Sequence, residues 1–382
     1  MLRSIVLGIY VLPAALFWLL RIRILTLTHP DRIGHLCIEP DCYIKEGLLG
    51  LRHRFFGIFL IPKAVAANRV LLALWAKKLT ILTSSFWCRI LLPFARLPFS
   101  SYPIAKYAVA INDTALCATI EAKWKGRRPL LTLPRDLSSK GWEALRELGL
   151  PPGAWYVCVH SREGGYSPGD ENLHSFRNSE IESYRLAMQA IVDRGGWCMR
   201  VGEASTKPLA ATKGVFDYAH SSLKSEWMDL FLCANCLFFL GNSSGLHLLS
   251  SVFGVPSALA NLIPVSSSLP VMPGDIGIPK VLKKRGTGET LKFVEILASP
   301  LGDYRFAERY AEEGILVEDN TPEDIRDLAL EMLEQCRGTF AYTPEDEALQ
   351  RRFQSLFREG HYSFGADSRI GRSFLRKYAD IV

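Results

Sequence analysis

The second half of the chain alternates short apolar runs with longer amphipathic stretches. Apolar runs cover residues 155–160, 197–201, 237–240 and 255–260, and each has the length of a buried strand. Residues 178–194, 225–233 and 246–253 between them have apolar positions at helical spacing, and Gly195 and Gly254 follow two of these stretches as stop signals. Strands that alternate with helices predict an α/β fold with a parallel, doubly wound sheet.

Two later segments carry strong helix start signals. Thr321-Pro322-Glu323-Asp324 and Thr343-Pro344-Glu345-Asp346 each place a hydroxyl at the N-cap, proline at the first helical position and a carboxylate at the third. This arrangement is a capping box, in which side chains satisfy the first backbone N–H groups of a helix. We therefore expect helices to begin at both sites.

The first half begins with an uncharged stretch at residues 4–20, flanked by Arg3 and Arg21. Its 17 residues lie near the lower limit for crossing a bilayer, so an in-plane anchor, a single span and a buried helix are all open. Residues 21–27 alternate like a strand and follow without a linker. An in-plane or peripheral membrane helix is therefore favoured over a spanning one.

A second feature of the first half also indicates a membrane surface. Residues 71–99 mix aromatic with basic side chains, as an interfacial surface requires. The aromatic residues are Trp75, Phe86, Trp87, Phe94 and Phe99, and the basic ones are Lys77, Lys78, Arg89 and Arg96. An ordinary amphipathic helix of a Rossmann-like domain is the alternative.

The charges are divided unevenly along the chain. Residues 1–150 hold 21 Lys and Arg against nine Asp and Glu, a net charge of +12, so the remainder carries −6. A basic half indicates an anionic partner. The sequence has no zinc finger, RNP-like strand or helix-turn-helix pattern, so we expect an anionic membrane surface rather than nucleic acid.

At 382 residues the chain is longer than one core usually supports, so two domains are expected. We assign residues 1–20 to a membrane-associating segment, 21–150 to an N-terminal domain, 151–340 to a C-terminal domain, and 341–382 to helices that pack back on the fold. The nine cysteines are scattered and mostly in apolar runs, which predicts buried thiols in a reducing compartment. Cys233 and Cys236 have metal-site spacing, but no second pair completes a site, so no metal is expected.

Polar residues follow three of the predicted strands, where ligands of open parallel sheets bind. After the third strand comes Gly241-Asn242-Ser243-Ser244-Gly245, ahead of a helix. Backbone N–H groups and hydroxyls at a helix N-terminus suit a diphosphate, so residues 242–245 are predicted donor ligands. A plain N-cap at Ser243 or Ser244 is the alternative.

The first strand is followed by His160, Arg162 and Tyr166. An arginine directly after an apolar strand is a poor choice for packing but a good clamp for phosphate oxygens. Arg177 ends a polar stretch that we expect to close over the same site. After the second strand come Gly202 and Glu203, and the carboxylate of Glu203 is a candidate acceptor for a ribose or base.

Several segments resemble a family of bacterial surface-polysaccharide glycosyltransferases that is distantly similar to fucosyltransferases. The resemblance rests on residues 31–36, 157–166, 174–184, 216–256 and 368–378. The fucosyltransferase pattern His-x-Arg-x-Gly-Asp is matched by His160, Arg162 and Gly164, but Gly165 replaces the Asp. The resemblance implies a GT-B fold of two Rossmann-like domains, with the nucleotide-sugar donor in the C-terminal domain and the acceptor in the N-terminal one. It also implies that no metal or other cofactor is needed.

The expected reaction transfers a sugar to a glycan or glycolipid acceptor at the cytoplasmic face of the inner membrane. Arg162 and the backbone amides of residues 242–245 would offset charge on the departing diphosphate, and His160 is a further catalytic candidate beside Arg162. His35, backed by Glu39 and Asp41, is the candidate base for the acceptor hydroxyl. A purely structural His35 is the alternative reading of that residue. Nucleotide-sugar epimerisation or hydrolysis, and a non-catalytic membrane scaffold, are the alternative functions.

Overall fold

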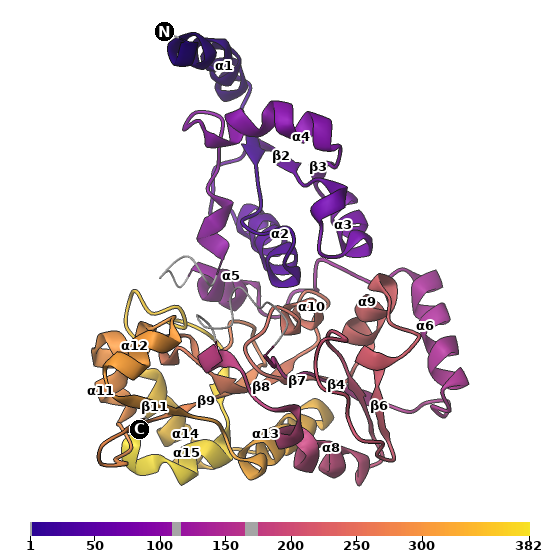
Figure 1. Ribbon diagram of the computed structural model, residues 1–382, viewed down its shortest axis with the longest axis vertical. Coiled ribbons are helices and arrows are strands. Elements are labelled where there is room, and N and C mark those ends of the chain that lie inside the picture. Colours follow the sequence, from indigo (N-terminus) through magenta and orange to yellow (C-terminus); the bar gives the residue numbers. More distant parts are fainter. Residues whose placement is uncertain (1, 109–115, 165–174) are drawn as a thin grey trace. The chain divides into compact units, whose positions relative to one another are not determined.

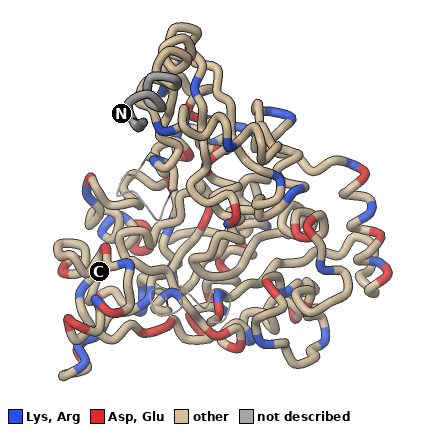
Figure 2. Tube along the Cα trace, turned by 45° about the horizontal axis from the view of Figure 1, so that its top comes forward, with Lys and Arg blue, Asp and Glu red and all other residues tan. Residues whose placement is uncertain are grey.

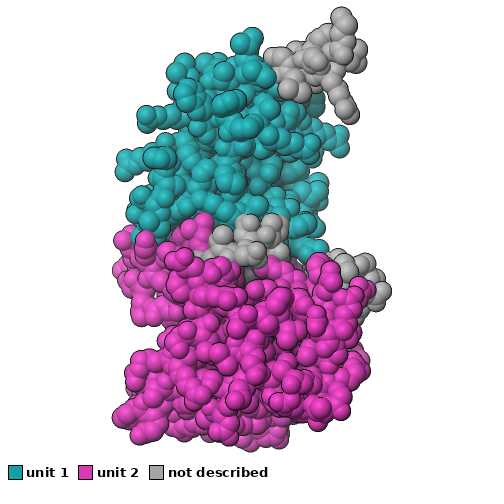
Figure 3. Space-filling view, turned by 90° about the vertical axis from the view of Figure 1, so that its left-hand side faces the viewer, with its two compact units in different colours: residues 1–112 teal, residues 113–382 magenta. Residues whose placement is uncertain are grey.

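The computed structural model describes residues 2–108, 116–164 and 175–382, with side chains from Tyr10 onward within these ranges. The chain divides into two compact units, residues 1–112 (unit 1) and 113–382 (unit 2), coloured separately in Figure 3. Each unit is built on its own parallel sheet, which confirms the predicted α/β class.

Unit 1 contains a three-stranded parallel sheet, in the order β1-β2-β3, with helices on both faces (Figure 1). Its strands are β1 (Ile22–Leu25), β2 (Phe56–Leu60) and β3 (Thr80–Leu82). Its helices are α1 (Leu2–Leu19), α2 (Ile33–Leu48), α3 (Arg69–Ala76) and α4 (Ser85–Leu91), with 3-10 turns η1 (Lys63–Val65), η2 (Leu92–Arg96) and η3 (Ile104–Tyr107).

The two faces of this sheet bury alternate side chains of the same strands. Ile24 and Leu60 belong to a cluster with Ala14 of α1, Cys88 of α4 and Phe94 of η2. The neighbouring residues Leu25 and Phe59 are also buried, and the Phe59 ring meets Tyr43 of α2 edge-on at 5.0 Å between centroids. The period-2 alternation of strands therefore places α1 and α4 on one face and α2 on the other.

The apolar N-terminal segment forms α1 and leads directly into β1, as the sequence indicated. The connection turns at Arg21, whose φ of 54° is unusual for a residue other than glycine. Within the described residues, no helix is both long and apolar enough to cross a membrane.

The aromatic–basic region is only partly an exposed surface. Trp75 is fully buried and donates its indole N–H to the carbonyl of Leu36 at 2.9 Å, and Phe94 is 6% exposed. Phe86, Trp87 and Phe99 are exposed. The expectation of an interfacial role was therefore wrong for Trp75 and Phe94, because both are needed in the core of unit 1.

Unit 2 contains a seven-stranded sheet in which every pairing is parallel, in the order β12-β9-β8-β7-β4-β5-β6. The strands are β4 (Tyr156–Val159), β5 (Trp197–Arg200), β6 (Val215–Asp217), β7 (Phe239–Gly241), β8 (Ser257–Leu262), β9 (Ile276–Pro279) and β12 (Arg369–Ile370). A separate antiparallel pair joins β10 (Val281–Lys284) to β11 (Ile315–Glu318). All four strands predicted in this half are present.

Helices cover both faces of the large sheet, as expected of a doubly wound fold (Figure 1). They are α5 (Leu116–Trp124), α6 (Arg135–Glu147), α8 (Arg185–Val192), α9 (Glu226–Asn235), α10 (His247–Ser251), α11 (Phe293–Ala298), α12 (Ala307–Glu312), α13 (Pro322–Arg337), α14 (Pro344–Gln354) and α15 (Arg372–Lys377). The 3-10 turns are η5 (Ser175–Arg177), η6 (Ile181–Tyr184), η7 (Tyr218–His220), η8 (Val265–Ser267), η9 (Pro300–Asp303) and η10 (Ala379–Ile381).

Both predicted capping boxes are confirmed. Thr321 and Asp324 exchange hydrogen bonds at the start of α13, and Thr343 and Asp346 do the same at the start of α14. The C-terminal segment packs α14 and α15 against the fold and also contributes β12 to the sheet edge.

The division between the units falls after Asn112, whereas the sequence analysis placed the domain boundary at residue 150. The segment between these positions packs on unit 2. On α6, the Trp142 ring lies edge-on to Tyr156 of β4 and Phe231 of α9, at 5.8 and 5.5 Å between centroids. Eight of the nine cysteines are buried, in agreement with the expected core positions.

Replacing Phe94 tests how α1 is attached to unit 1. The rings of Tyr10 and Phe17 each meet Phe94 edge-on at 5.1 Å, so Phe94→Ala removes the surface on which α1 packs. We expect a loss of about 3–5 kcal/mol in the unfolding free energy of unit 1, measured in urea, and faster proteolytic release of α1. Phe99→Ala, at a 61% exposed position, is the control. Equal behaviour of the two variants would contradict this packing.

Candidate anion-binding site

The large sheet changes direction between two neighbouring strands, β4 and β7. From β4 the chain proceeds outward through β5 and β6, then returns to β7 and proceeds the other way through β8 and β9. Loops that follow strands on the two sides of such a reversal diverge and leave a crevice at the carboxyl edge. The loop beginning at His160 follows β4 and the loop beginning at Asn242 follows β7, so both predicted anion-binding loops flank this point.

Asn242 joins these loops through a side chain that is fully buried. Its Oδ1 accepts from the backbone N–H of Arg162 at 2.9 Å, and its Nδ2 donates to the carbonyl of Arg177 at 3.2 Å and to Ser179 Oγ at 3.0 Å. Two other segments, the start of the loop after β4 and residues 177–179, are thereby fixed to the loop that carries Asn242. The sequence analysis assigned Asn242 to the donor directly, whereas these contacts make its side chain a brace for the residues around the crevice.

The Arg162 side chain is oriented by a short relay of polar groups. Its Nη1 donates to Asn178 Oδ1 at 2.7 Å, and the carbonyl of Asn178 accepts from Lys280 Nζ at 2.8 Å. Lys280 is buried after the end of β9 and forms an ion pair with Asp319 at 2.5 Å. Burial lowers the pKa of Lys280, and Asp319 opposes that shift. The position of the Arg162 guanidinium thus depends on Asn178 and, through it, on Lys280 and Asp319.

Arg177 lies on the other side of the same brace. Its Nη2 donates to the carbonyl of Ser243 at 2.8 Å and to Ser243 Oγ at 3.3 Å. The two arginines predicted to bind phosphate are therefore each tied to loop 242–245 or its brace by hydrogen bonds to neutral oxygen atoms. Guanidinium groups held in this way are suited to bidentate recognition of phosphate oxygens.

The helix after the loop is shorter than the sequence indicated. It was expected over residues 246–253, but α10 covers only His247–Ser251. Ser244 Oγ accepts from the backbone N–H of Leu246 at 3.3 Å, which makes a local serine turn rather than a helix N-cap. Because a helix of five residues has a small dipole, any anion here would depend on side chains and loop N–H groups more than on α10.

The glycine that opens the loop is required by packing. A Cβ at Gly241 would lie 2.6 Å from the backbone oxygen of His160, inside contact distance. Gly241 therefore allows the ends of β4 and β7 to approach each other. Gly245 is half-buried beyond the two serines, and its backbone is a candidate for close ligand approach, as predicted.

His160 is a neutral imidazole in this setting. Its Nδ1 donates to the carbonyl of Val201 at 3.0 Å, which leaves Nε2 as an acceptor. Burial lowers the pKa of His160 to about 4, and the nearby charges of Arg200, Arg162 and Lys224 act in the same direction. At neutral pH His160 accepts a hydrogen bond, from a sugar hydroxyl for example, but contributes no positive charge toward a phosphate.

The loop after β5 supplies the remaining predicted residues. Gly202 has a φ of 143°, and a Cβ there would lie 3.2 Å from His160 Nδ1, so glycine keeps this loop against the imidazole. The carboxylate of Glu203 is 56% exposed and lies 3.8 Å from Lys224 Nζ. It remains a candidate acceptor for a ribose. Tyr166 lies outside the described residues.

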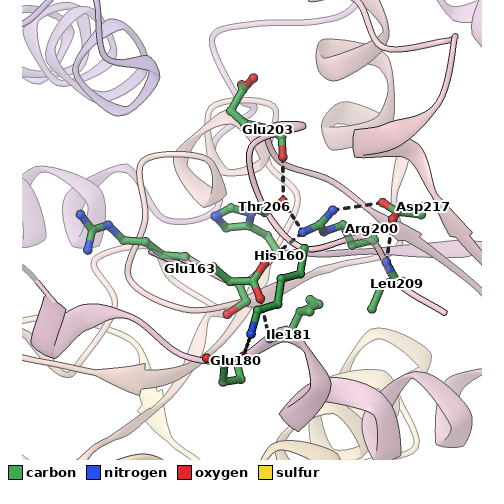
Figure 4. Close-up of polar contacts among 12 residues, drawn as sticks. His160, Glu163, Glu180, Ile181, Arg200, Glu203, Thr206, Leu209 and Asp217 are labelled. Atoms are coloured by element: carbon green, nitrogen blue, oxygen red, sulfur yellow. Dashed lines mark hydrogen bonds and ion pairs between the residues drawn. The ribbon is translucent and has the colours of Figure 1, made fainter. Parts of the chain in front are cut away.

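A buried arginine that the sequence analysis did not select holds the loops on the β5 side together. Arg200, 1% exposed, donates to Glu163 and to Asp217, each at 3.1 Å, and to Thr206 (Figure 4). Glu163 in turn accepts from the backbone N–H of Ile181 at 3.3 Å. Arg200 is thus neutralised by two carboxylates and has a structural role. The sequence offered one signal for Arg200, because it is a charged residue near the end of the apolar run 197–201.

A cavity of about 420 Å³ lies beside this network and apart from the crevice. It borders edge strand β6 and is lined mainly by apolar residues between Pro208 and Phe216, with Asp217 and His220 at its polar side. None of the predicted site residues lines it. Its position therefore gives no reason to place the donor there.

In unit 1, His35 lies on the first turn of α2. Its Nδ1 is 2.7 Å from Glu39 Oε1, and the other carboxylate oxygen of Glu39 accepts from the backbone N–H of Thr28 at 3.0 Å. Glu39 is fully buried, so it fixes the ring and the tautomer, leaving Nε2 to accept a proton. Asp41 forms an ion pair with Lys45 at 2.6 Å. The prediction that Asp41 supports His35 was therefore wrong.

In the parts of the chain that are described, no group of three or more His, Cys, Asp or Glu side chains is arranged to hold a metal ion. The buried pair Cys233 and Cys236 belongs to the core, and Cys236 Sγ lies 3.5 Å from the carbonyl of Cys233. The expectation of a metal-free site stays a prediction.

The ion pairs of Arg200 can be tested by unfolding. Arg200→Met leaves Glu163 and Asp217 without their buried cation, so we expect a loss of about 3–5 kcal/mol in the unfolding free energy of unit 2, measured in urea. Lys207→Met removes an exposed cation 3.3 Å from Glu180 and should cost less than about 1 kcal/mol. A similar, small loss in both variants would show that Arg200 does not hold these loops.

No protein-family model matches this chain, and no curated protein does. Solved structures are similar to it at low identity, and three of them are described here. The heptosyltransferase TibC, described as dodecameric and iron-containing and solved with ADP-D-β-D-heptose, is 14% identical, with a TM-score of 0.36 over 63% of this chain and 57% of its own. The family 9 glycosyltransferase from Veillonella parvula has 12% identity and a TM-score of 0.34 over 62% and 80%.

The third is the E. coli ADP-heptose LPS heptosyltransferase II, with 15% identity and a TM-score of 0.35 over 62% of this chain and 84% of its own. The match with TibC spans just over half of that protein's length. All three neighbours are glycosyltransferases, and none of these three is a fucosyltransferase. With TM-scores this low, the function of this chain must be argued from its own residues.

Proposed function

We propose that this protein is a glycosyltransferase that binds the diphosphate of a nucleotide-sugar in unit 2, between the loops after β4 and β7. The observation that carries this proposal is the placement of Arg162 and Arg177 at the reversal of the sheet, each oriented by hydrogen bonds to neutral oxygen atoms. Two directed guanidinium groups suit a diphosphate, and the reversal point is where open α/β sheets bind nucleotides.

In the proposed reaction the acceptor oxygen bonds to the anomeric carbon as the bond from that carbon to the diphosphate breaks. Arg162 and Arg177 would offset the negative charge that develops on the departing diphosphate. The neutral His160 would accept a hydrogen bond from the donor, and Glu203 would accept from its ribose. This assignment needs no bound metal ion, because the arginines perform the charge compensation.

We further propose that His35 takes the proton of the acceptor hydroxyl. The buried carboxylate of Glu39 holds the Nδ1 side of the ring and stabilises the imidazolium that forms when Nε2 accepts this proton. The acceptor is proposed to be a glycan or glycolipid, and the reaction to take place at the cytoplasmic face of the inner membrane. The net positive charge of unit 1 supports an anionic surface as a partner.

Removing the guanidinium of Arg162 tests the donor site. We expect Arg162→Ala to lower kcat about 10²–10³-fold, because one donor of charge stabilisation is lost, and Arg162→Lys to restore part of the rate. Titration calorimetry with ADP, GDP, UDP and CDP should give heat with at least one nucleotide, more weakly in the alanine variant. Arg194→Ala, at an exposed position ahead of β5, is the control. No heat with any nucleotide would remove the donor-site assignment.

Replacing His35 tests the base separately. We expect His35→Gln to lower kcat about 10²–10⁴-fold, while the affinity for the nucleotide stays unchanged. Glu39→Gln should lower kcat less, because the ring keeps a hydrogen-bonding neighbour. His53→Gln, an exposed histidine of the same unit, serves as the control. A wild-type rate for His35→Gln would assign His35 a structural role. Product analysis without acceptor would separate transfer from hydrolysis or epimerisation.

A further inference from the structure

Exposed apolar side chains are concentrated in the smaller unit. Of 19 large apolar residues that are exposed in the described parts of the chain, 14 belong to unit 1, although it has fewer than half the residues of unit 2. Most of them lie on or beside two helices, α1 and α4. Single exposed apolar residues are normal in a soluble protein, but a group of this size marks an interaction surface.

The apolar residues of α1 lie on two opposite sides of the helix. Tyr10, Ala14 and Phe17 pack on the cluster that contains Phe94. Leu12, Leu16 and Leu19 follow helical spacing about half a turn away, and they are 79%, 53% and 70% exposed. The inner side already accounts for the attachment of α1 to unit 1. The second apolar side exposes Leu12, Leu16 and Leu19 to water, which is unfavourable, so we expect another partner to cover it.

The same arrangement recurs on α4, which packs on the same cluster through Cys88. Phe86 and Ile90 point away from that contact, and Trp87 lies beside Phe86 with ring centroids 5.3 Å apart. α1 and α4 pack on the same cluster, so their exposed apolar residues both lie on the side of the sheet that this cluster covers. We call the exposed residues Leu12, Leu16, Leu19, Phe86, Trp87 and Ile90 the outer apolar layer.

Charge identifies the kind of partner that this layer fits. Unit 1 holds 14 Lys and Arg against four Asp and Glu, a net charge of +10. Figure 2 shows these charged positions along the chain. Arg21, at the end of α1, Arg89 of α4 and Arg96 of η2 are all exposed beside the outer apolar layer. Apolar residues with neighbouring cations are the composition that anionic lipid surfaces select.

Three of the four acidic residues of unit 1 are removed from its surface. Glu39 is held by His35, Asp41 pairs with Lys45, and Glu46 accepts hydrogen bonds from Tyr102, Tyr107 and Lys106, at 2.6, 2.5 and 2.6 Å. All three carboxylates are buried. In the described part of unit 1 only Asp31 is an exposed acidic residue. The surface is therefore almost purely cationic, more so than the net charge indicates.

We propose that the outer apolar layer inserts into one leaflet of an anionic phospholipid bilayer, with α1 lying in the membrane plane. The inner side of α1 packs on protein, so lipid cannot surround this helix, and the chain turns at Arg21 directly into β1 without a linker. A second copy of the chain is a poorer partner, because two cationic surfaces would face each other. This inference names the residues by which the protein would reach the membrane of the proposed function, but it does not depend on sugar transfer.

Vesicle flotation with the full chain tests this proposal. We expect binding to phosphatidylcholine vesicles that contain phosphatidylglycerol, little binding to phosphatidylcholine alone, and weakening by added salt. Leu16→Asp with Trp87→Asp should lower the partition coefficient by on the order of 10-fold or more. Leu186→Asp with Val294→Asp, at exposed apolar positions on helices of unit 2, is the matched control and should bind like the wild type.

Replacing the cations beside the outer apolar layer gives a second test. Arg89→Gln with Arg96→Gln should lower binding to anionic vesicles about five-fold for each charge removed, whereas Lys284→Gln with Arg309→Gln in unit 2 should not. Nucleotide affinity, measured without vesicles, should be equal in all variants, which separates this proposal from the donor site.

Two results would overturn the proposal: no binding of the wild type to anionic vesicles, or equal losses in the layer and control variants. If the wild type does not bind vesicles but forms a dimer that Leu16→Asp with Trp87→Asp dissociates, the outer apolar layer is an interface between two copies of the chain.

Discussion

The buried amide of Asn242 is the contact on which the proposed donor site depends. A reversal of strand order brings β4 and β7 together, but the loops that follow them would diverge if nothing joined them. The Asn242 side chain links the backbone of Arg162 to the segment that carries Arg177, with no exposure to solvent. A buried amide has a large cost if its partners are lost, so these three segments keep one geometry or separate together. Both guanidinium positions follow from that geometry.

Sequence periodicity predicted the central strands β4, β5, β7 and β8 of unit 2, because buried parallel strands are short apolar runs with glycine or polar residues at their ends, but it did not predict β6, β9, β10, β11 or β12. The same reasoning located Arg162 and loop 241–245, since polar residues after a strand stand out. It did not predict the role of Asn242 or the relay from Lys280 through Asn178. Those contacts join residues 80 and 102 positions apart, and neighbouring strands cannot be recognised from the order of residues in the chain.

Local composition did not predict which aromatic residues of unit 1 are buried and which are exposed. Trp75 and Phe94 lie in the same aromatic–basic segment, residues 71–99, as Trp87 and Phe99, yet the first two are buried and the last two exposed. Tertiary packing decides between them, because Trp75 donates a hydrogen bond to Leu36 of α2 and Phe94 belongs to the cluster that contains Ile24 and Leu60. Similarly, Trp142 precedes the predicted boundary at residue 150, but its contacts with Tyr156 and Phe231 place its helix in unit 2.

The two units therefore have different surface chemistry. Unit 2 holds 31 basic and 35 acidic residues, so its affinity for an anion must come from the local placement of Arg162 and Arg177 rather than from net charge. In the described part of unit 1 the exposed charged residues are basic except for Asp31, and the other three carboxylates are buried. One unit is suited to a small, highly charged ligand, and the other to an extended anionic surface.

The central claim is that a nucleoside diphosphate binds at the reversal of the unit 2 sheet. A crystal structure of the protein with the nucleotide that binds it in solution tests this claim most directly. Our account predicts diphosphate density between the loops after β4 and β7, within hydrogen-bonding distance of Arg162 or Arg177. Density elsewhere, for example in the cavity beside β6, with both arginines keeping only their contacts within the protein, would contradict it.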